Sequence, residues 1–348
     1  MQKALTLFVI SIIMNVNFLF IDAQAKTIKG IYLHAYSVSN ETKFYELVNL
    51  IENTGLNTMV IDVKNDDGLV TYDSKLPLVH QLQSDQHAPI KDIASVLQKL
   101  KEKDIYTIAR IVVFKDPYLA KKKPEWAIKR KNQTLWKDAK GTMWIDPNRK
   151  EVWDYCISIA QEVAELGFNE IQWDYVRFPD YKNLNKEAVF QNSPYKSKEV
   201  AIEEFLKYAY SKVKSTDLTI SADVFGLTAT AKDDMGIGQR WERIIQHVDV
   251  ISPMMYPSHY TNGAYGIANP ESNPYQLVTE GLQDAIEKNS RIQSKGRHVA
   301  KIRPWYQDFD VKVPYTLKQV QEQIHAGNDL EIRDYLIWSA RNDYSFFK

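Results

Sequence analysis

The sequence predicts an α/β protein folded as a (β/α)8 TIM barrel, a single domain whose last helix is short or missing. Apolar, β-branched runs alternate with helical patterns, which is typical of βα units in a parallel sheet. Eight such runs, the number that a closed barrel needs, cover residues 30–36, 58–64, 106–114, 170–178, 219–225, 248–256, 299–307 and 335–341. A doubly wound sheet usually has a glycine-rich turn after its first strand, and LHAYSVSNET contains no glycine.

Capping residues mark the helices between these runs. Asp146 is a candidate N-cap before Pro147 at the first helical position, and Gly167 follows the last turn of the same helix. Thr316 is a candidate N-cap of a later helix. The chain ends at Lys348, directly after the eighth run, so we expect little or no eighth helix.

Long insertions follow the second, third and sixth strands, at residues 65–89, 115–146 and 257–273. In a barrel, loops between a strand and the next helix lie on the C-terminal face, where active sites are built. Trp144 in the second insertion could serve as a stacking platform for a sugar ring. The alternative is that Trp144 packs under a long loop.

The first 25 residues predict a secretory signal peptide. A short basic start precedes an apolar run over residues 4–20, and AQA at 23–25 is a small-x-small cleavage site. The mature domain is then 26–348, exported to the bacterial envelope or beyond. The alternative is a retained anchor, although the run falls short of the ~20 apolar residues of a typical span.

Composition restricts the class of protein. With 44% hydrophobic and 25% charged residues, the chain is typical of a globular domain. The formal net charge is zero and basic runs are short, which argues against a nucleic-acid partner. Cys156 is the single cysteine, so we expect no intramolecular disulfide.

Strand parity brings polar and aromatic side chains to one end of the predicted barrel, because residues two apart on a strand share a face. The candidates come from strand ends and the loops beside them. The predicted substrate-binding residues are His34, Asp62, Lys64, Arg110, Trp144, Tyr256, His259, Arg303, Trp305 and Trp338.

Two carboxylates end neighbouring strands and form the predicted catalytic pair, Asp174 and Asp223. Glycoside hydrolysis needs one protonated acid for the leaving oxygen and one carboxylate as nucleophile or base. Neighbouring like charges in a partly apolar site push one pKa upward, which separates the two roles.

Each catalytic candidate also has a structural interpretation. Asp174 could form a buried ion pair with Arg177 or Arg110, and Asp223 could cap the turn that follows it. Glu170 lies deeper in its strand and is interpreted as structural.

The binding candidates have alternatives as well. Asp62 and Lys64 could neutralise each other, and His34 and His259 could be ordinary hydrogen-bonded histidines. The seven histidines are scattered without H-x-x-x-H or a Cys/His cluster, so the sequence predicts no metal site and no cofactor.

Several motifs carry a resemblance to a known family. They are VIDVKNDDGLVTY, ARIVVFKDPYLAKKKPEWA, WIDPNRKEVWDY, GFNEIQWDYVRFP, SADVFG, GIGQ, ISPMMYPSHY and RPWYQDF. Together they resemble a bacterial glycoside hydrolase-like domain family of unknown function, a TIM-barrel group. The resemblance covers nearly the whole mature chain and implies a glycoside hydrolase.

Two looser resemblances bear on mechanism. Alpha-amylase-like barrels place a nucleophile on the fourth strand and an acid on the fifth, which implies these roles for Asp174 and Asp223. Their arginine two residues before the nucleophile is here Gln172, and their fifth-strand acid is normally Glu. Chitinase-type barrels carry D-x-D-x-E and M-x-Y; here E-x-Q-x-D occupies 170–174 and M-x-Y occupies 254–256.

The sequence therefore predicts a secreted, metal-independent glycoside hydrolase that cleaves a polysaccharide or oligosaccharide with two carboxylates. The alternative is a non-catalytic glycan-binding barrel of the cell envelope, which would keep the aromatic cleft without turnover.

Overall fold

The computed structural model describes residues 26–190 and 193–344, and the predicted signal peptide lies outside the described residues. Parallel strands form a closed barrel, because β10 pairs with both β8 and β11. In chain order the barrel strands are β1 (Lys29–Leu33), β2 (Thr58–Lys64), β3 (Tyr106–Val112), β5 (Glu170–Asp174), β7 (Thr219–Phe225), β8 (Val250–Met254), β9 (Lys301–Ile302) with β10 (Trp305–Gln307), and β11 (Tyr335–Trp338). The predicted (β/α)8 barrel is confirmed.

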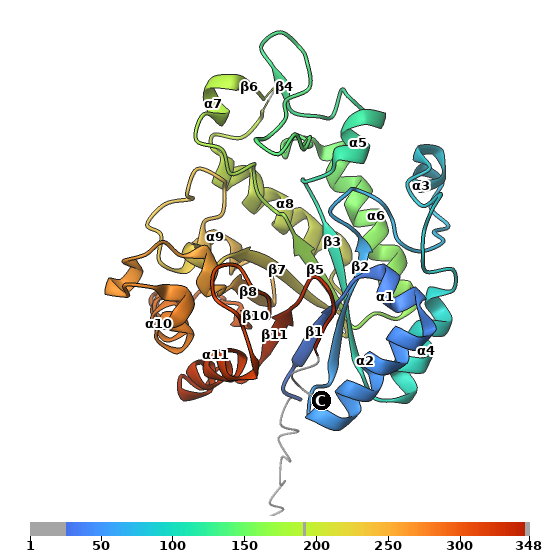
Figure 1. The fold of residues 1–348 in the computed structure, drawn as a ribbon. Coiled ribbons are helices and arrows are strands. Elements are labelled where there is room, and N and C mark those ends of the chain that lie inside the picture. Colours follow the sequence, from blue (N-terminus) through green and yellow to red (C-terminus); the bar gives the residue numbers. More distant parts are fainter. Residues whose placement is uncertain (1–25, 191–192, 345–348) are drawn as a thin grey trace, which may run out of the picture.

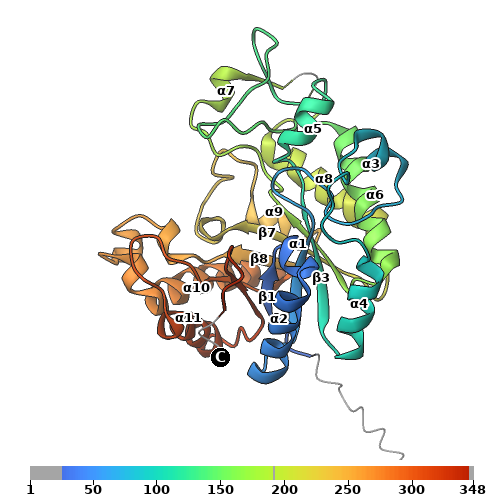
Figure 2. The ribbon, with the colours of Figure 1, turned by 45° about the vertical axis from the view of Figure 1, so that its right-hand side comes forward.

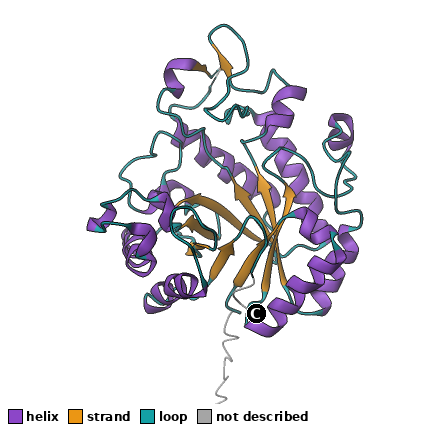
Figure 3. Cartoon of the chain, in the orientation of Figure 1, coloured by secondary structure: helices purple, strands orange, loops and turns teal. Residues whose placement is uncertain are grey.

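Helices surround the strands, which gather in the middle of the molecule (Figure 3). They are α1 (Ala35–Ser39), α2 (Glu41–Thr54), α3 (Pro77–Leu82), α4 (Ile93–Glu102), α5 (Pro117–Lys122), α6 (Lys150–Leu166), α7 (Leu184–Glu187), α8 (Lys198–Val213), α9 (Trp241–Ile244), α10 (Pro274–Gln293) and α11 (Leu317–Asp329). No helix follows β11 in the chain described to residue 344, in line with the predicted missing eighth helix. Within the described ranges, we find no helix with the length and apolar character to cross a membrane.

The strands are buried on both faces, as the unbroken apolar runs predict. Residues of one parity, including Met59 and Ile61 of β2, join the large core between the sheet and the helices. Residues of the other parity, including Val60 and Ile108, form a smaller cluster inside the barrel. This inner cluster also contains Tyr256, so it reaches the C-terminal mouth.

Two local predictions need correction. The seventh run is interrupted between β9 and β10, where Pro304 lacks the N–H that a ladder requires. Helix α6 begins at Lys150, after the predicted N-cap, because Asp146 instead accepts bonds from the backbone N (3.0 Å) and Nδ2 (2.7 Å) of Asn148. The expected N-cap at Thr316 is confirmed and forms a capping box with Gln319.

The loops after β3 and β5 rise together above the barrel. Residues of β4 (Lys129–Arg130) pair antiparallel with β6 (Ala188–Val189), which joins the two loops. Both views show this extension beyond the strand ends, beside α5 and α7 (Figures 1 and 2). The extension therefore adds height on the side of the barrel where βα loops gather.

Candidate active site

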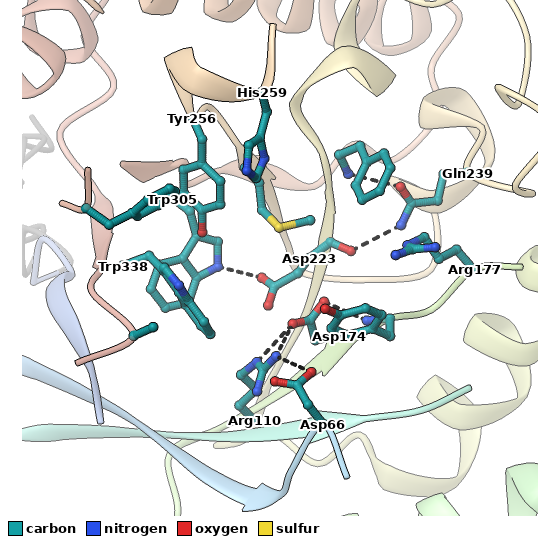
Figure 4. A pocket seen from close by; sticks show the side chains of 15 residues that line it. Asp66, Arg110, Asp174, Arg177, Asp223, Gln239, Tyr256, His259, Trp305 and Trp338 are labelled. Atoms are coloured by element: carbon teal, nitrogen blue, oxygen red, sulfur yellow. Dashed lines mark hydrogen bonds and ion pairs between the residues drawn. The ribbon is translucent and has the colours of Figure 1, made fainter. Parts of the chain in front are cut away.

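A cavity of about 490 Å³ opens at the C-terminal mouth of the barrel. Strand ends and the loops beside them supply its lining, and the side chains converge on its centre (Figure 4). The lining residues are Asp66, Arg110, Asp174, Tyr175, Arg177, Asp223, Phe225, Gln239, Met254, Tyr256, His259, Trp305, Phe309, Trp338 and Ala340.

Asp174 ends β5, and both of its carboxyl oxygens accept hydrogen bonds. Its Oδ2 accepts bonds from Arg110 Nε (2.9 Å) and Nη2 (2.6 Å), and its Oδ1 accepts one from the backbone N of Tyr175 (2.6 Å). Tyr175 has a left-handed backbone with φ of 50°, which ends the strand immediately after Asp174. A non-glycine residue in this region is strained, and such strain is concentrated at functional sites.

Arg110 links Asp174 to two further acids. Its Nη1 donates to Asp62 at 2.6 Å and its Nη2 approaches Asp66 at 3.4 Å. Burial alone would lower the pKa of Arg110, but the charges of Asp174, Asp62 and Asp66 raise it well above its ordinary value. Burial also opposes ionisation of Asp66, yet Arg110 and Lys115 lower its pKa overall.

Asp223 lies on β7 beside Asp174. The register pairs Trp173 with Ala222, so the next residue on each strand, Asp174 and Asp223, reaches the mouth side by side. Asp223 Oδ1 accepts a bond from Trp305 Nε1 at 2.7 Å. Burial and the charge of Asp174 raise the pKa of Asp223 well above its ordinary value, despite the opposing effect of that bond.

Aromatic rings occur on both sides of the cavity, because Tyr175 and Phe225 line it beside Arg177. Trp305 and Trp338 lie on one side of Asp223, while Arg177 and Gln239 lie on the opposite side (Figure 4). The Trp305 and Trp338 rings meet edge to face at 5.5 Å between centroids. Trp305 is 1% exposed, whereas Trp338 is only half-buried, so the ring of Trp338 is the one on which a sugar can pack.

Two further cavities adjoin the first. One of about 560 Å³ shares Phe225, Met254 and His259 with it, and one of about 310 Å³ shares Tyr175, Arg177 and Phe225. Phe225 lines all three cavities, so they lie next to one another at the barrel mouth.

The structure brings most of the predicted site residues together. Those that line the central cavity are Asp174, Asp223, Arg110, Tyr256, His259, Trp305 and Trp338. The predicted pairing of Asp174 with Arg110 also exists, whereas no ion pair joins Asp174 to Arg177. Asp223 does not cap a turn with its carboxylate, which is bonded to Trp305 instead.

Lys64 does not reach the cavity, and its predicted substrate contact is wrong. A bulge between Asp62 and Lys64 pairs Asp62 with Arg110 but Lys64 with Ile111, so the two side chains face different layers. Lys64 is fully buried, 2.7 Å from Asp116 and 2.7 Å from the carbonyl of Val112.

Arg303 and Asp62 also lie outside the cavity in which they were predicted to bind substrate. Arg303 lies deeper in the barrel, paired through both terminal nitrogens with Glu170, which confirms the structural interpretation of that acid. Asp62 sits behind Arg110 and accepts a bond from Tyr32 Oη at 2.6 Å. Both residues are 1% exposed and neither lines the cavity, so they position neighbours instead of contacting a sugar there.

His34 and Trp144 lie outside the central cavity. His34 lines a separate hollow of about 230 Å³, and its Nδ1 accepts the backbone N–H of Tyr36 at 3.3 Å. Trp144 is 3% exposed and donates to Asp138 at 3.1 Å, so it packs under the loop, as its structural alternative proposed. One edge of Trp144 still borders the 310 Å³ cavity.

Sequence reasoning missed several lining residues as binding candidates. Asp66 and Gln239 come from loops, where no strand parity predicts a direction. Tyr175 and Arg177 follow Asp174 in a stretch predicted to continue as strand. These residues lie in the motifs DVKNDDG, GIGQ and WDYVRFP, which carried the family resemblance. That resemblance was the one indication in the sequence that they belong to the site.

The fold and site define a (β/α)8 barrel whose mouth holds a close carboxylate pair beside aromatic rings, an arrangement suited to glycoside hydrolysis. Among the residues that the structure describes, no group of three or more His, Cys, Asp or Glu side chains could hold a metal ion.

Comparison with known proteins agrees with this class. Residues 30–344 match the model of the family described as "Putative glycosyl hydrolase domain", and the chain belongs to that family. A search among curated proteins gave no match.

Solved structures give further likenesses. A hypothetical protein from Ruminiclostridium thermocellum is 38% identical, covering 55% of this chain and 96% of that chain, with a TM-score of 0.50. The PgaB (BpsB) glycoside hydrolase domain from Bordetella bronchiseptica has a TM-score of 0.63 at 12% identity, covering 91% and 94%. The alpha-galactosidase of Thermus thermophilus has a TM-score of 0.52 at 10% identity, covering 92% and 58%. The last two likenesses concern the fold alone.

Proposed function

We propose that this protein is an exported hydrolase of glycosidic bonds in a polysaccharide or oligosaccharide. Asp223 is the general acid, and Asp174 is the nucleophile or charge-stabilising carboxylate. The observation that carries the proposal is the asymmetry of the pair: burial and Asp174 raise the pKa of Asp223, while Arg110 compensates the charge of Asp174. Membership of a glycosyl hydrolase domain family supports the reaction class.

The hydrogen bond from Trp305 supports a position for the proton of Asp223. Trp305 Nε1–H can only donate, so it occupies Oδ1 of Asp223 and leaves Oδ2 to carry the proton into the cavity. Asp223 gives this proton to the glycosidic oxygen as its bond to the anomeric carbon breaks. Asp174 bonds to the anomeric carbon or stabilises its positive charge. Water then attacks that carbon, displaces the Asp174 carboxylate where a covalent bond has formed, and gives a proton to Asp223.

Other lining residues place the sugar in this scheme. Tyr256 and Trp338 present rings to the cavity, and His259 packs edge to face on Tyr256 at 5.2 Å between centroids. Burial lowers the pKa of His259, so its imidazole is neutral near pH 7 and binds by hydrogen bonding. The scheme uses no metal. Export rests on the leader at residues 1–25.

The test is the release of reducing ends from a panel of bacterial exopolysaccharides and cell-wall glycans by the mature chain. We expect Asp174→Asn and Asp223→Asn each to lower turnover by about 10²-fold or more, because each removes an acid–base or covalent role. Asp217→Asn is the matched control, since Asp217 is exposed in the loop before β7 and lies outside the cavity lining.

The outcomes separate this function from its alternative. Undiminished release by Asp174→Asn would contradict the assigned role. Binding of a glycan by the wild type and both variants, without release by any of them, would favour a non-catalytic glycan-binding barrel.

A further inference from the structure

Arg177 differs from the other buried arginines of the described chain. Arg110 and Arg303 are 1% exposed and form ion pairs, the first with Asp174 and Asp62, the second with Glu170. Arg177 is 8% exposed, and no described carboxylate lies within 4.0 Å of its guanidinium. A buried charge without a partner is costly, so this arginine needs an explanation.

The protein holds the Arg177 guanidinium in place without neutralising it. Three rings surround its Cζ, with centroid distances of 4.6 Å to Phe225, 4.9 Å to Trp144 and 5.0 Å to Tyr175. Nη1 donates to the carbonyl of Phe178 at 3.0 Å, which leaves other N–H groups without a described acceptor. Burial lowers the pKa of Arg177, the opposite direction to the pKa shift of Arg110.

The position of Arg177 gives it access to a ligand. Its side chain lines both the central cavity and the adjoining cavity of about 310 Å³. In Figure 4 it lies on the side of Asp223 opposite the tryptophans, so a chain bound across the carboxylate pair would pass over it. Lys115 and Lys140 also line the smaller cavity.

Two acids line the smaller cavity too, but one of them is already engaged. Asp138 accepts the backbone N–H groups of Lys140 (2.9 Å) and Thr142 (2.9 Å) and the indole N–H of Trp144 (3.1 Å). Asp180 is exposed at the rim, where water screens its charge. The charges of Asp138 and Asp180 act on Arg177 only from beyond ion-pair distance, so its remaining N–H groups are still free for an oxyanion.

We propose that the hollow on the Arg177 side of the carboxylate pair binds a sugar that carries an anionic substituent. The argument is one of desolvation. A neutral sugar over Arg177 would remove its remaining water and supply no compensating charge, whereas an oxyanion would supply charge-assisted bonds to the free N–H groups. The inference rests on the proposed function, because it names a substrate class for the same site.

A uronic acid carboxylate and an ester-linked phosphate or sulfate share this chemistry, and the arginine fork fits any of them. The matching half of the substrate, on the tryptophan side, would present an apolar sugar face. The scissile bond would then join a stacked residue to an acidic one.

The test measures binding in the Asp174→Asn variant, so that turnover does not enter. The carboxylate probes are oligosaccharides of polygalacturonate, alginate and hyaluronan, each compared with its carboxyl-reduced form. Chondroitin sulfate and a phosphorylated teichoic acid test the sulfate and phosphate esters. We expect at least one acidic probe to bind, with about ten- to hundredfold weaker binding of its neutral counterpart, since charge-assisted hydrogen bonds are lost.

Arg177→Gln in the same background should abolish the preference for the acidic form, and Arg177→Lys should keep part of it. Arg333→Gln is the matched control, because Arg333 is exposed before β11 and outside these cavities. Arg177→Lys also serves as a control for misfolding, because it keeps a cation among the same three rings.

Equal binding of acidic and neutral forms, a preference unchanged in Arg177→Gln, or no binding of any acidic probe would overturn the inference. Cleavage of neutral glycans alone by the wild type would overturn it while leaving the hydrolase intact. Arg177-dependent binding of acidic glycans without cleavage would support the inference and contradict the proposed hydrolase.

Discussion

At the scale of single residues, Trp305 positions the carboxyl group of Asp223 and Asp174 shifts its pKa. Trp305 fixes the carboxyl through Oδ1, and the charge of Asp174 adds to burial in raising the pKa of Asp223. A general acid has to be protonated at the working pH. If Asp223 is the general acid that we propose, glycosidase activity should fall as the pH rises through the pKa of Asp223.

Trp305→Phe should move this basic limb to higher pH. The indole N–H bond favours the charged form of Asp223 and so lowers its pKa; without the bond, the pKa rises further. The measurement is the pH profile of kcat/KM for wild type and variant. A limb that stayed in place, or moved to lower pH, would contradict the role of Asp223 as the acid.

Asp223→Asn should stabilise the fold near pH 7 while abolishing turnover. The folded pKa of Asp223 is above its ordinary value of 3.8, so folding retains a proton that the unfolded chain releases. The contribution of Asp223 to the free energy of unfolding is therefore lost as the pH rises from about 3.8 towards the folded pKa. Asn can still accept the bond from Trp305 and has no proton to lose.

The check is the unfolding midpoint of both proteins across pH, by chemical denaturation. The gain should be largest near neutrality and shrink as the pH falls below about 3.8, where the wild-type carboxyl group is protonated in the unfolded chain as well as in the folded one. A variant that is less stable than wild type at pH 7 would show that Asp223 is held as a carboxylate.

At the scale of elements, strand parity correctly brought Asp174 and Asp223 to the cavity at the barrel mouth but failed for Lys64 on β2. Asp174 and Asp223 end regular strands, where alternation fixes the direction of each side chain. The bulge after Asp62 breaks this alternation and turns Lys64 to the helix layer, where it meets Asp116. No residue type in the sequence marks this bulge, so strand alternation alone could not predict the direction of the Lys64 side chain.

Lys64→Met should destabilise the protein strongly, by about 3–5 kcal/mol, because it leaves Asp116 buried without its cation. Both side chains are 0% exposed, and burial already raises the pKa of Asp116. Lys64→Met with Asp116→Asn should recover much of the loss, since Asn can still accept the α5 cap bond that Asp116 takes from Leu119 N at 2.7 Å. Urea unfolding of the three proteins measures this coupling.

Equal stability of Lys64→Met and wild type would mean that the pair is not needed for the fold. Loss of sugar binding in a stably folded Lys64→Met variant would instead return Lys64 to the site.

At the scale of the whole molecule, the barrel was predictable because eight buried strands leave a long apolar signal. The residues missed were those whose position depends on several loops meeting. Gln239 reaches the cavity from the loop after β7, and its Oε1 accepts the backbone N–H of Phe225 at 2.9 Å. Arg177 depends on three rings, from the loop after β3, the end of β5 and the end of β7. Contacts between several loops form only when the chain folds, so no local sequence pattern predicts them.

The closed barrel also determines the stereochemistry that we expect. Asp174 and Asp223 occupy neighbouring positions on adjacent parallel strands, which lie about 4.8 Å apart. Retaining glycosidases hold their carboxyl groups about 5–5.5 Å apart, whereas inverting ones need about 6.5–9.5 Å to admit a water between acid and base. If the two carboxyl groups keep the spacing of their strands, we expect retention, with Asp174 as the covalent nucleophile.

Proton NMR of the first product formed from a cleaved glycan tests this expectation, because the new anomer is visible before mutarotation. We expect the anomeric configuration of the substrate, together with a glycosyl adduct on the peptide that contains Asp174 in rapidly quenched enzyme. The inverted anomer would assign Asp174 as the base for water, and would require the two carboxyl groups to diverge from their strand ends. The Asp174→Asn variant, which lacks the nucleophile, is the matched control for the adduct.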